Sequence, residues 1–374
     1  MKSILSLVRK VLQPLADSPV GTAVRKVGSP NVLPYVTVIL GFVIVQSLLA
    51  TGGISATLSG QLIPICAYIV MAVSLNLTVG VLGELSLGHA GFMSVGAFSG
   101  VVACMSLDTA IASEPLRLVV GMVIGAVLAG VAGFLIGIPV LRLRGDYLAI
   151  VTLAFGEIIK NIINCLAIGQ DSDGLHFGFL VAASQLGIEP DGRVLVDGPM
   201  GMVNIPHLSS FIAGFVLILV TLFIVLNLVN SRSGRAIMAL RDNRIAAESV
   251  GIPVTKYKLM AFVTSAALAG AAGTLYALSF STIVATKFGF NTSILVLVYV
   301  VLGGLGNMTG SIIAAALLTV LPELLRNFND YRMLVYAIVL VLVMLATNND
   351  TLKAIPRRIR ARFSAQTAEV NADA

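Results

Sequence analysis

The chain has 374 residues, of which 57% are hydrophobic and only 11% are charged, and its formal net charge is +6. Soluble globular proteins carry about 25% charged residues, so these values exclude a water-soluble fold, which could not bury this much apolar surface. Many stretches of about 20 apolar residues are long enough to cross a bilayer, and they predict an all-α polytopic membrane protein, because helices satisfy their own backbone groups in lipid.

Residues 1–32 precede the first long apolar stretch and are predicted to form a basic cytoplasmic leader. Apolar residues at helical spacing, from Ile4 to Leu15, give it an amphipathic face that can lie on the membrane surface. A cleaved signal peptide is the alternative interpretation, although its basic region is normally much shorter. We therefore expect the leader to stay attached to the first span.

Ten segments are predicted to span the membrane between residues 33 and 348. They cover residues 33–50, 61–81, 88–107, 118–141, 147–168, 209–229, 259–282, 293–302, 309–325 and 332–348. The eighth segment is short and ends in the helix-breaking sequence GGLGN at 303–307. Non-helical backbone at membrane depth is tolerated only where protein or a water-filled cavity surrounds it.

The distribution of basic residues predicts the sidedness of these spans. With the N-terminus in the cytoplasm, 18 of the 24 lysines and arginines fall in cytoplasmic segments, five fall outside, and Lys160 lies within a span. Because lysine and arginine are enriched in cytoplasmic loops, both termini are predicted to be cytoplasmic. Residues 349–374 then form a basic, disordered cytoplasmic tail.

The longest predicted outer segment is 169–208, which carries five acidic residues and one basic residue, Arg193. Connections of about 40 residues are uncommon and usually have a role of their own. This length favours a structured loop that serves in docking or as a lid, and a plain solvated connector is the alternative.

The stretch 231–258 is charged, although long apolar runs flank it on both sides. Ser233 can cap a first short helix, and Asp242 or Asn243 can cap a second one. Gly251 then ends the second helix. The sequence therefore predicts a pair of short cytoplasmic helices between two spans, and a solvated basic loop is the alternative.

This stretch resembles the cytoplasmic loop of permeases in bacterial ATP-binding-cassette (ABC) importers. Those loops carry Glu-Ala-Ala, three variable residues and Gly. Ala246, Ala247 and Gly251 match that spacing, while Ile245 stands where the family has Glu.

Further motifs resemble the LivM-like permease subunits of the branched-chain amino acid ABC importer family. They are NLTVGVLGELSLGHAGFMSVGAFSG (76–100), RGDYLAIVTLAFGEIIKN (144–161), LGGLGNMTGSIIAA (302–315) and DGPMGMVNIP (197–206). The last is a degraded Gly-Gly-Pro-x-Gly loop, with Asp197 in place of the first glycine. The resemblance covers roughly residues 33–350, while the leader and 169–196 fall outside it.

The resemblance implies a transmembrane permease subunit (33–348) that imports branched-chain amino acids or similar small solutes across the bacterial plasma (inner) membrane. The implied partners are a homologous second permease, two cytoplasmic ABC ATPase subunits and an extracytoplasmic solute-binding protein, besides membrane lipid, with no role for nucleic acid.

The chain itself is then expected to be no enzyme and to need no cofactor, because the ATPase subunits bind the ATP. A P-loop needs a Gly-Lys pair, and this sequence contains none. The residues expected to couple the permease to the ATPases are Arg235, Leu240, Arg241, Asp242, Arg244, Ala246, Ala247, Glu248 and Gly251.

Three groups of residues, at 83–89, 157–160 and 303–306, are candidates for the translocation path. The sequence GELSLGH (83–89) can interrupt a helix and expose backbone groups to a substrate, while close packing of its glycines and a structural hydrogen bond of His89 are the alternatives. Glu157 and Lys160 share one helix face and form either a structural ion pair or part of the path. The full set is Gly83, Ser86, Gly88, His89, Glu157, Lys160, Gly303, Gly304 and Gly306.

Other functions remain as alternatives. Related permeases carry urea or short amides, so these are the alternative substrates. An ion-coupled secondary transporter is disfavoured because Glu157 is the only clear intramembrane acid. A membrane-embedded enzyme is disfavoured because the sequence shows no nucleophile–base arrangement and no metal-ligand cluster.

Overall fold

The computed structural model describes residues 32–51, 55–108, 110–143, 145–171, 174–181 and 192–325, and a few helical positions between 334 and 341. The chain divides into two compact units, 1–316 and 317–374, and the fold and site below belong to the first. The predicted leader, tail and most of the tenth predicted span (332–348) lie outside the described residues.

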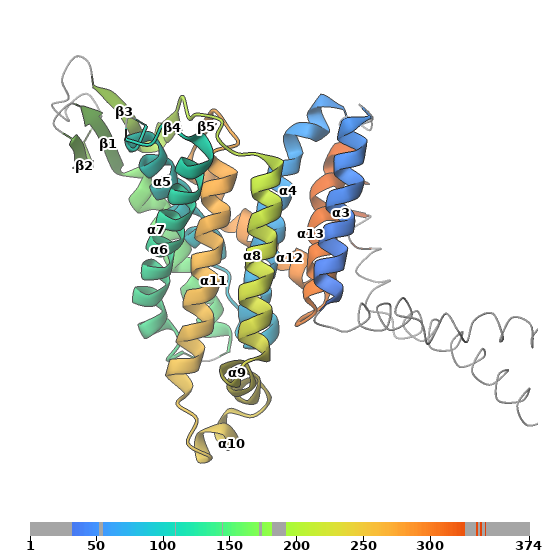
Figure 1. Cartoon of the computed structure of the whole chain (residues 1–374). Helices are drawn as coiled ribbons and strands as arrows, with labels where there is room; N and C mark the ends of the chain where they lie inside the picture. Colours follow the sequence, from blue (N-terminus) through green and yellow to red (C-terminus); the bar gives the residue numbers. More distant parts are fainter. Residues whose placement is uncertain are drawn as a thin grey trace, which may run out of the picture. The chain divides into compact units, whose positions relative to one another are not determined.

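Helices make up most of the described chain (Figure 1). They are α3 (Leu33–Ala50), α4 (Ala56–Asn76), α5 (His89–Ser106), α6 (Glu114–Val140), α7 (Asp146–Asn164), α8 (Phe211–Asn230), α9 (Arg232–Asp242), α10 (Arg244–Ser249), α11 (Val254–Ala277), α12 (Phe290–Gly303) and α13 (Met308–Leu324). Within the described residues, seven helices are long and apolar enough to cross a membrane. The prediction of a polytopic helical membrane protein is confirmed, and the count of ten spans stays a prediction.

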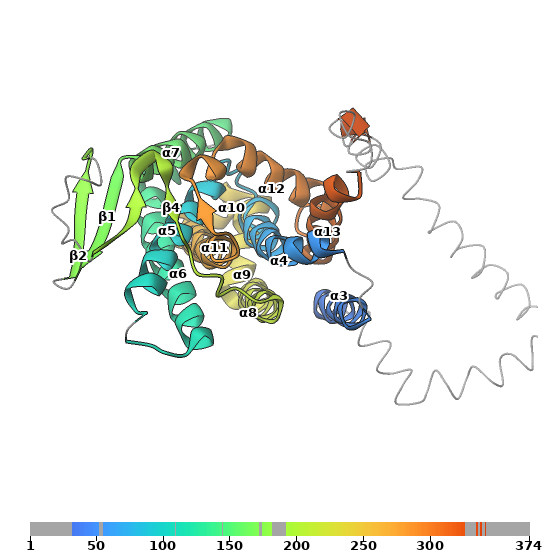
Figure 2. The same cartoon turned by 90° about the horizontal axis from the view of Figure 1, so that it is seen from above.

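Helix α11 forms the centre of the helix group, and Figure 2 shows it surrounded by α4, α5, α6 and α8. Small residues let these helices approach closely. A Cβ atom at Gly96 of α5 would overlap the backbone of Gly270 in α11, and one at Gly125 of α6 would lie 2.8 Å from the Gly96 carbonyl oxygen. The Thr274 hydroxyl donates a hydrogen bond of 2.8 Å to the same carbonyl. Packing of small residues is what holds helices together in lipid.

The fifth predicted span is wrong at its end. Helix α7 stops at Asn164, and residues predicted to continue it form the strand β1 (Leu166–Asp171). This strand pairs antiparallel with β2 (Gly174–Phe179) and β3 (Arg193–Asp197) in the order β2-β1-β3. The short strands β4 (Met202–Val203) and β5 (Thr282–Ile283) also pair. The segment 169–208 is therefore a structured loop in its described parts, and these strands depart from the all-α prediction.

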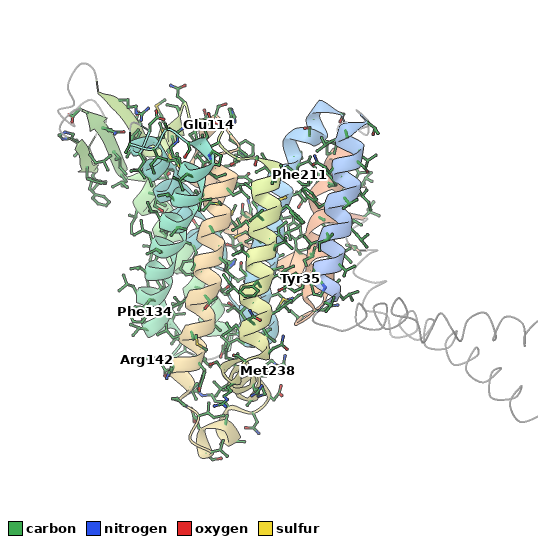
Figure 3. All side chains as sticks on the ribbon, in the orientation of Figure 1. Tyr35, Glu114, Phe134, Arg142, Phe211 and Met238 are labelled. Atoms are coloured by element: carbon green, nitrogen blue, oxygen red, sulfur yellow. The ribbon has the colours of Figure 1, made fainter. Side chains whose placement is uncertain are left out.

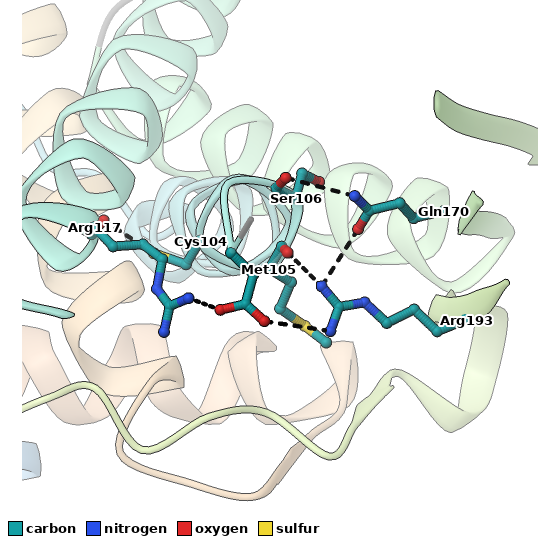
Figure 4. Close-up of polar contacts among 7 residues, drawn as sticks. Cys104, Met105, Ser106, Arg117, Gln170 and Arg193 are labelled. Atoms are coloured by element: carbon teal, nitrogen blue, oxygen red, sulfur yellow. Dashed lines mark hydrogen bonds and ion pairs between the residues drawn. The ribbon is translucent and has the colours of Figure 1, made fainter. Parts of the chain in front are cut away.

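The sheet is anchored on the C-terminal end of α5 (Figure 4). The Arg193 guanidinium donates hydrogen bonds to the Met105 carbonyl oxygen and, at 3.5 Å, to Gln170 Oε1. Asp108 pairs with Arg117 and also lies 3.9 Å from Arg193. The last carbonyl groups of a helix lack partners within the helix and favour a positive charge. Arg193 meets both needs and fixes the sheet to the helix group.

Loops of opposite predicted sidedness gather at opposite ends of the helix group. The Arg241 guanidinium of α9 bonds the Gly80 carbonyl, and Asn76 bonds Gly306 N, so segments predicted as cytoplasmic meet at one end. Figure 3 shows Arg142 and Met238 at that end and Glu114 and Phe211 at the other. This grouping agrees with the predicted sidedness, although the orientation of the termini stays a prediction.

Candidate functional site

The helix that begins at Ala56 is interrupted before α5. Helix α4 continues into the π-helix η1 (Leu77–Val81), in which all five residues are buried. The Leu82 amide donates to the Leu77 carbonyl at 3.1 Å, which is the wider turn of a π-helix, and Gly83 follows with a φ of +80°. Single-turn π-helices are frequent at functional sites, so residues 77–88, the first break, are a candidate site.

Helix α7 packs directly against this first break. The Leu87 amide donates to the Thr152 hydroxyl at 3.1 Å. A Cβ atom at Gly88 would overlap the Thr152 carbonyl oxygen, so only glycine allows the two backbones to approach this closely. Of the predicted site residues, Ser86 and Gly88 thus lie buried beside α7, while Gly83, at the start of the turn, is exposed.

Buried polar side chains line the start of α5. The His89 ring is 2% exposed, and its Nε2 atom lies 2.8 Å from the Ser74 hydroxyl. The Ala90 amide donates to the Ser293 hydroxyl of α12 at 3.1 Å. His89 thus makes an interhelical hydrogen bond, as the structural alternative for this residue predicted. Among the described residues, the buried hydroxyls of Thr78 and Ser86 have no hydrogen-bond partner.

A second break follows α12, at residues 303–307. Gly304 and Gly306 have φ values of +93° and +79°, which favour glycine. Asn76 joins this second break to the first. Its Oδ1 atom accepts from Gly306 N at 2.8 Å, and its Nδ2 atom donates to the Ser311 hydroxyl at 2.9 Å. The two breaks therefore lie against each other.

Glu157 and Lys160 form an ion pair on α7, as their spacing predicts. The Glu157 carboxylate also accepts from the Phe290 amide at 3.0 Å, so it caps the N-terminus of α12. The pair borders a recess of about 580 Å³ that Thr286, Lys287 and other polar residues also line. A helix rises about 1.5 Å per residue, so the length of α12 separates this recess from the second break. The first break lies nearer to the recess, because Gly88 packs against Gly156, the neighbour of Glu157 in α7.

The charged stretch forms the predicted pair of short helices, with one corrected cap. Ser231, not Ser233, caps α9, because its hydroxyl accepts from the Gly234 amide at 3.1 Å. Asn243 caps α10 by accepting from the Ala246 amide at 3.0 Å. Gly251 ends the pair with a φ of +83°.

The apolar residues of this helix pair face two different ways. Leu240 and Ala247 are 4% exposed and pack inside the chain, together with Ile237. Ile245 and Val250 are 81% and 75% exposed. The surface around them is charged and includes the Arg244–Glu248 ion pair, an N–O distance of 3.0 Å. Of the predicted coupling residues, Leu240 and Ala247 thus lie beneath the exposed surface rather than on it.

Four residues that build this end of the molecule were not among the predicted site residues. Lys258 of α11 and Glu84 of the first break form an ion pair with side chains only 5% and 15% exposed. Asn76 and Thr152 hold the breaks through hydrogen bonds. Asn76 could have been recognised as a polar residue inside an apolar run, whereas nothing in the sequence indicates which segments these four side chains join.

Two interrupted helices, packed against each other beside a polar helix pair at one end of an apolar helix group, define a class: a polytopic membrane permease. The chain belongs to the family described as branched-chain amino acid transport system / permease component, whose sequence model matches residues 57–344. The recognised resemblance to this family is confirmed.

Several characterised proteins are similar to the chain. The high-affinity branched-chain amino acid transport system permease protein LivM of Salmonella typhimurium is 37% identical over 299 residues, which cover 74% of this chain. LivM of Escherichia coli is 36% identical over 298 residues with the same coverage. The chain spans 66% of the length of each of these two relatives. The fructose import permease protein FruG of Bifidobacterium longum is 26% identical over 309 residues, 80% of this chain and 84% of FruG. No solved structure matches the chain.

Proposed function

We propose that the chain is the permease subunit of an ATP-driven importer and couples to separate ATPase subunits through α9 and α10. The observation that carries this proposal is the surface of α10 and its following turn. There the large apolar side chains of Ile245 and Val250 are 81% and 75% exposed, and the surface around them is charged. An apolar centre with a charged rim is typical of a protein–protein interface.

The proposed complex contains a homologous second permease, two cytoplasmic ABC ATPase subunits and an extracytoplasmic solute-binding protein, in the bacterial inner membrane. In this complex, closure of the ATPase pair displaces α9 and α10 and shifts the permease between its inward- and outward-facing states. A ligand or partner can shift such an equilibrium only by binding the two states differently. The chain performs no covalent chemistry in this scheme.

Branched-chain amino acids are the proposed substrates. The identity of 37% to a LivM protein supports this choice over urea or short amides. The similarity to a fructose import permease indicates that the fold serves more than one solute class. We therefore assign selectivity mainly to the solute-binding protein, and passage to the permease.

Uptake by the complete complex tests the proposal. The tagged full-length chain, purified from its native membranes with its partners and reconstituted into vesicles, should import leucine only when ATP and the solute-binding protein are supplied. Import of leucine by the chain alone, driven by a proton or sodium gradient, would instead identify a secondary transporter.

We also propose that Glu157 and Lys160 contribute to the translocation path at the recess beside α12. Glu157→Ala combined with Lys160→Ala should lower leucine uptake about tenfold, equal to about 1.4 kcal/mol of barrier height. Lys160→Ala alone is the matched comparison, because it leaves the Glu157 bond to the Phe290 amide in place. Leucine uptake in vesicles measures the effect, and normal uptake by a double variant that inserts normally would remove both residues from the path.

A further inference from the structure

One arginine connects the proposed ATPase dock to the first break. The Arg241 Nη1 atom, on the last turn of α9, donates to the Gly80 carbonyl at 3.0 Å. Gly80 lies in the π-helix η1, which ends one residue later, and the last carbonyl groups of a helix have no partner within it. The methylene chain of Arg241 also lies against Gly83, where a Cβ atom would be 2.5 Å from Arg241 Cγ. Arg241 thus holds both the end of the π-helix and the turn that follows.

The other end of the helix pair is tied to the same break. Lys258 lies in the first turns of α11, after the pair, and forms a buried ion pair with Glu84. Along the chain, Arg241 precedes the exposed surface of α10 and Lys258 follows it, and both contact the first break. Any displacement of that surface acts on both contacts.

Asn76 continues the connection from the first break to the second. It lies one turn before Gly80 and binds the Gly306 amide at 2.8 Å. A Cβ atom at Gly80 would overlap both the Asn76 side chain and the Gly306 backbone. Atoms this closely packed transmit displacement rather than absorb it, so a shift of η1 must move Gly306.

We propose that Arg241 and Asn76 are positioning residues that pass the movement of α9 and α10 to the two helix breaks. This inference rests on the proposed function. The π-helix is the element with two arrangements: a return to α-helical bonding shifts its hydrogen bonds by one residue and moves the Gly80 carbonyl. Arg241 favours one arrangement when α9 is in place, and Asn76 carries the change to the turn after α12.

Arg241→Gln tests the first step in the reconstituted complex. ATP hydrolysis and leucine uptake are both measured, with co-purification of the ATPase subunits as the control for assembly. We expect leucine imported per ATP hydrolysed to fall by about tenfold or more, within the usual range of coupling between sites. Arg142→Gln is the matched control, because it removes an exposed arginine from the same end of the molecule. Arg241→Lys, which can still donate to Gly80, should restore part of the coupling.

Asn76→Ala and Ser311→Ala form a second matched pair. Both variants lose the bond between Asn76 and Ser311, but only Asn76→Ala loses the bond to Gly306. Uptake per ATP should therefore fall in Asn76→Ala and stay near the wild-type value in Ser311→Ala. If Asn76→Ala does not fold, Arg241→Gln decides alone.

Equal losses of hydrolysis and uptake in Arg241→Gln would show a purely structural contact and overturn the inference. Wild-type uptake per ATP in that variant would overturn it as well. A wild-type complex that neither hydrolyses ATP nor imports leucine would instead refute the proposed function, so the two failures are distinguishable.

Discussion

Ile245→Glu combined with Val250→Glu should abolish ATP-driven uptake while the permease still folds. Both side chains are largely exposed, so the added charges disturb no packing within the chain. In the proposed complex they would instead be buried against an ATPase subunit. Hot-spot residues at the centre of an interface cost about 2 kcal/mol or more each when they are replaced, so the loss of two such residues weakens association by roughly several hundred-fold.

Co-purification of the ATPase subunits with the variant measures this effect. Ile245→Ala combined with Val250→Ala is the matched variant, and it should retain part of the association because it removes apolar area without burying charge. A full complement of ATPase subunits on the doubly charged variant would place the dock elsewhere.

Two other substitutions at this helix pair have different expected effects. Gly251→Leu forces a branched side chain into a left-handed backbone conformation, which costs roughly 1–2 kcal/mol, and should displace Val250 and uncouple hydrolysis from uptake. Ala247 is 4% exposed, so Ala247→Arg would disrupt the packing of α10 inside the chain as well as its docking. Ile245 and Val250 therefore give the cleaner test.

Gly96→Leu should prevent the helix group from packing. Gly96 lies where α5, α6 and α11 meet, and even a Cβ atom there would overlap the backbone of Gly270. Overpacking of a tight core costs typically about 1–3 kcal/mol, and a leucine adds three more carbon atoms. The same substitution pushes Thr274 away from the Gly96 carbonyl and breaks their hydrogen bond.

Thermal unfolding of the detergent-solubilised protein measures the loss, with Gly96→Ala as the milder variant. We expect Gly96→Ala to lower the Tm by about 5 °C or more. Gly41→Ala is the control, because no atom of the described residues outside its own helix lies within 4 Å of a Cβ at this position of α3. Equal changes of Tm in the two alanine variants would contradict the packing described for α5.

Local sequence signals predicted the membrane spans and the helix pair well. Apolar length predicted six of the seven helices that are long enough to cross a membrane, whereas α12 was predicted too short because residues 285–288 precede it as a 3-10 turn. The cap at Asn243 could be predicted because an asparagine side chain accepts a hydrogen bond from the backbone amide three residues later, here that of Ala246. The cap of α9 was misplaced by two residues because Ser231 and Ser233 are equally good caps, and only the observed start of the helix at Arg232 separates them.

Contacts between residues far apart in the chain could not be predicted from the sequence. The residues Leu166–Ala167–Ile168 read as a continuation of α7, since a short apolar run has no periodicity that separates strand from helix. Their strand pairing depends on β2 and β3, and the most distant pair joins Ala167 to Asp197, 30 positions away. Likewise, Asn76 and Gly306 are 230 residues apart, so no local pattern indicates that the two breaks meet.

Leucine uptake by vesicles that contain the purified complex decides whether α9 and α10 couple the permease to an ATPase. We expect uptake that requires ATP and that disappears in the variant with Ile245→Glu and Val250→Glu, while that permease stays folded and inserted. Uptake that needs no ATP, or that persists in this variant, would contradict the claim that α9 and α10 couple this permease to an ATPase.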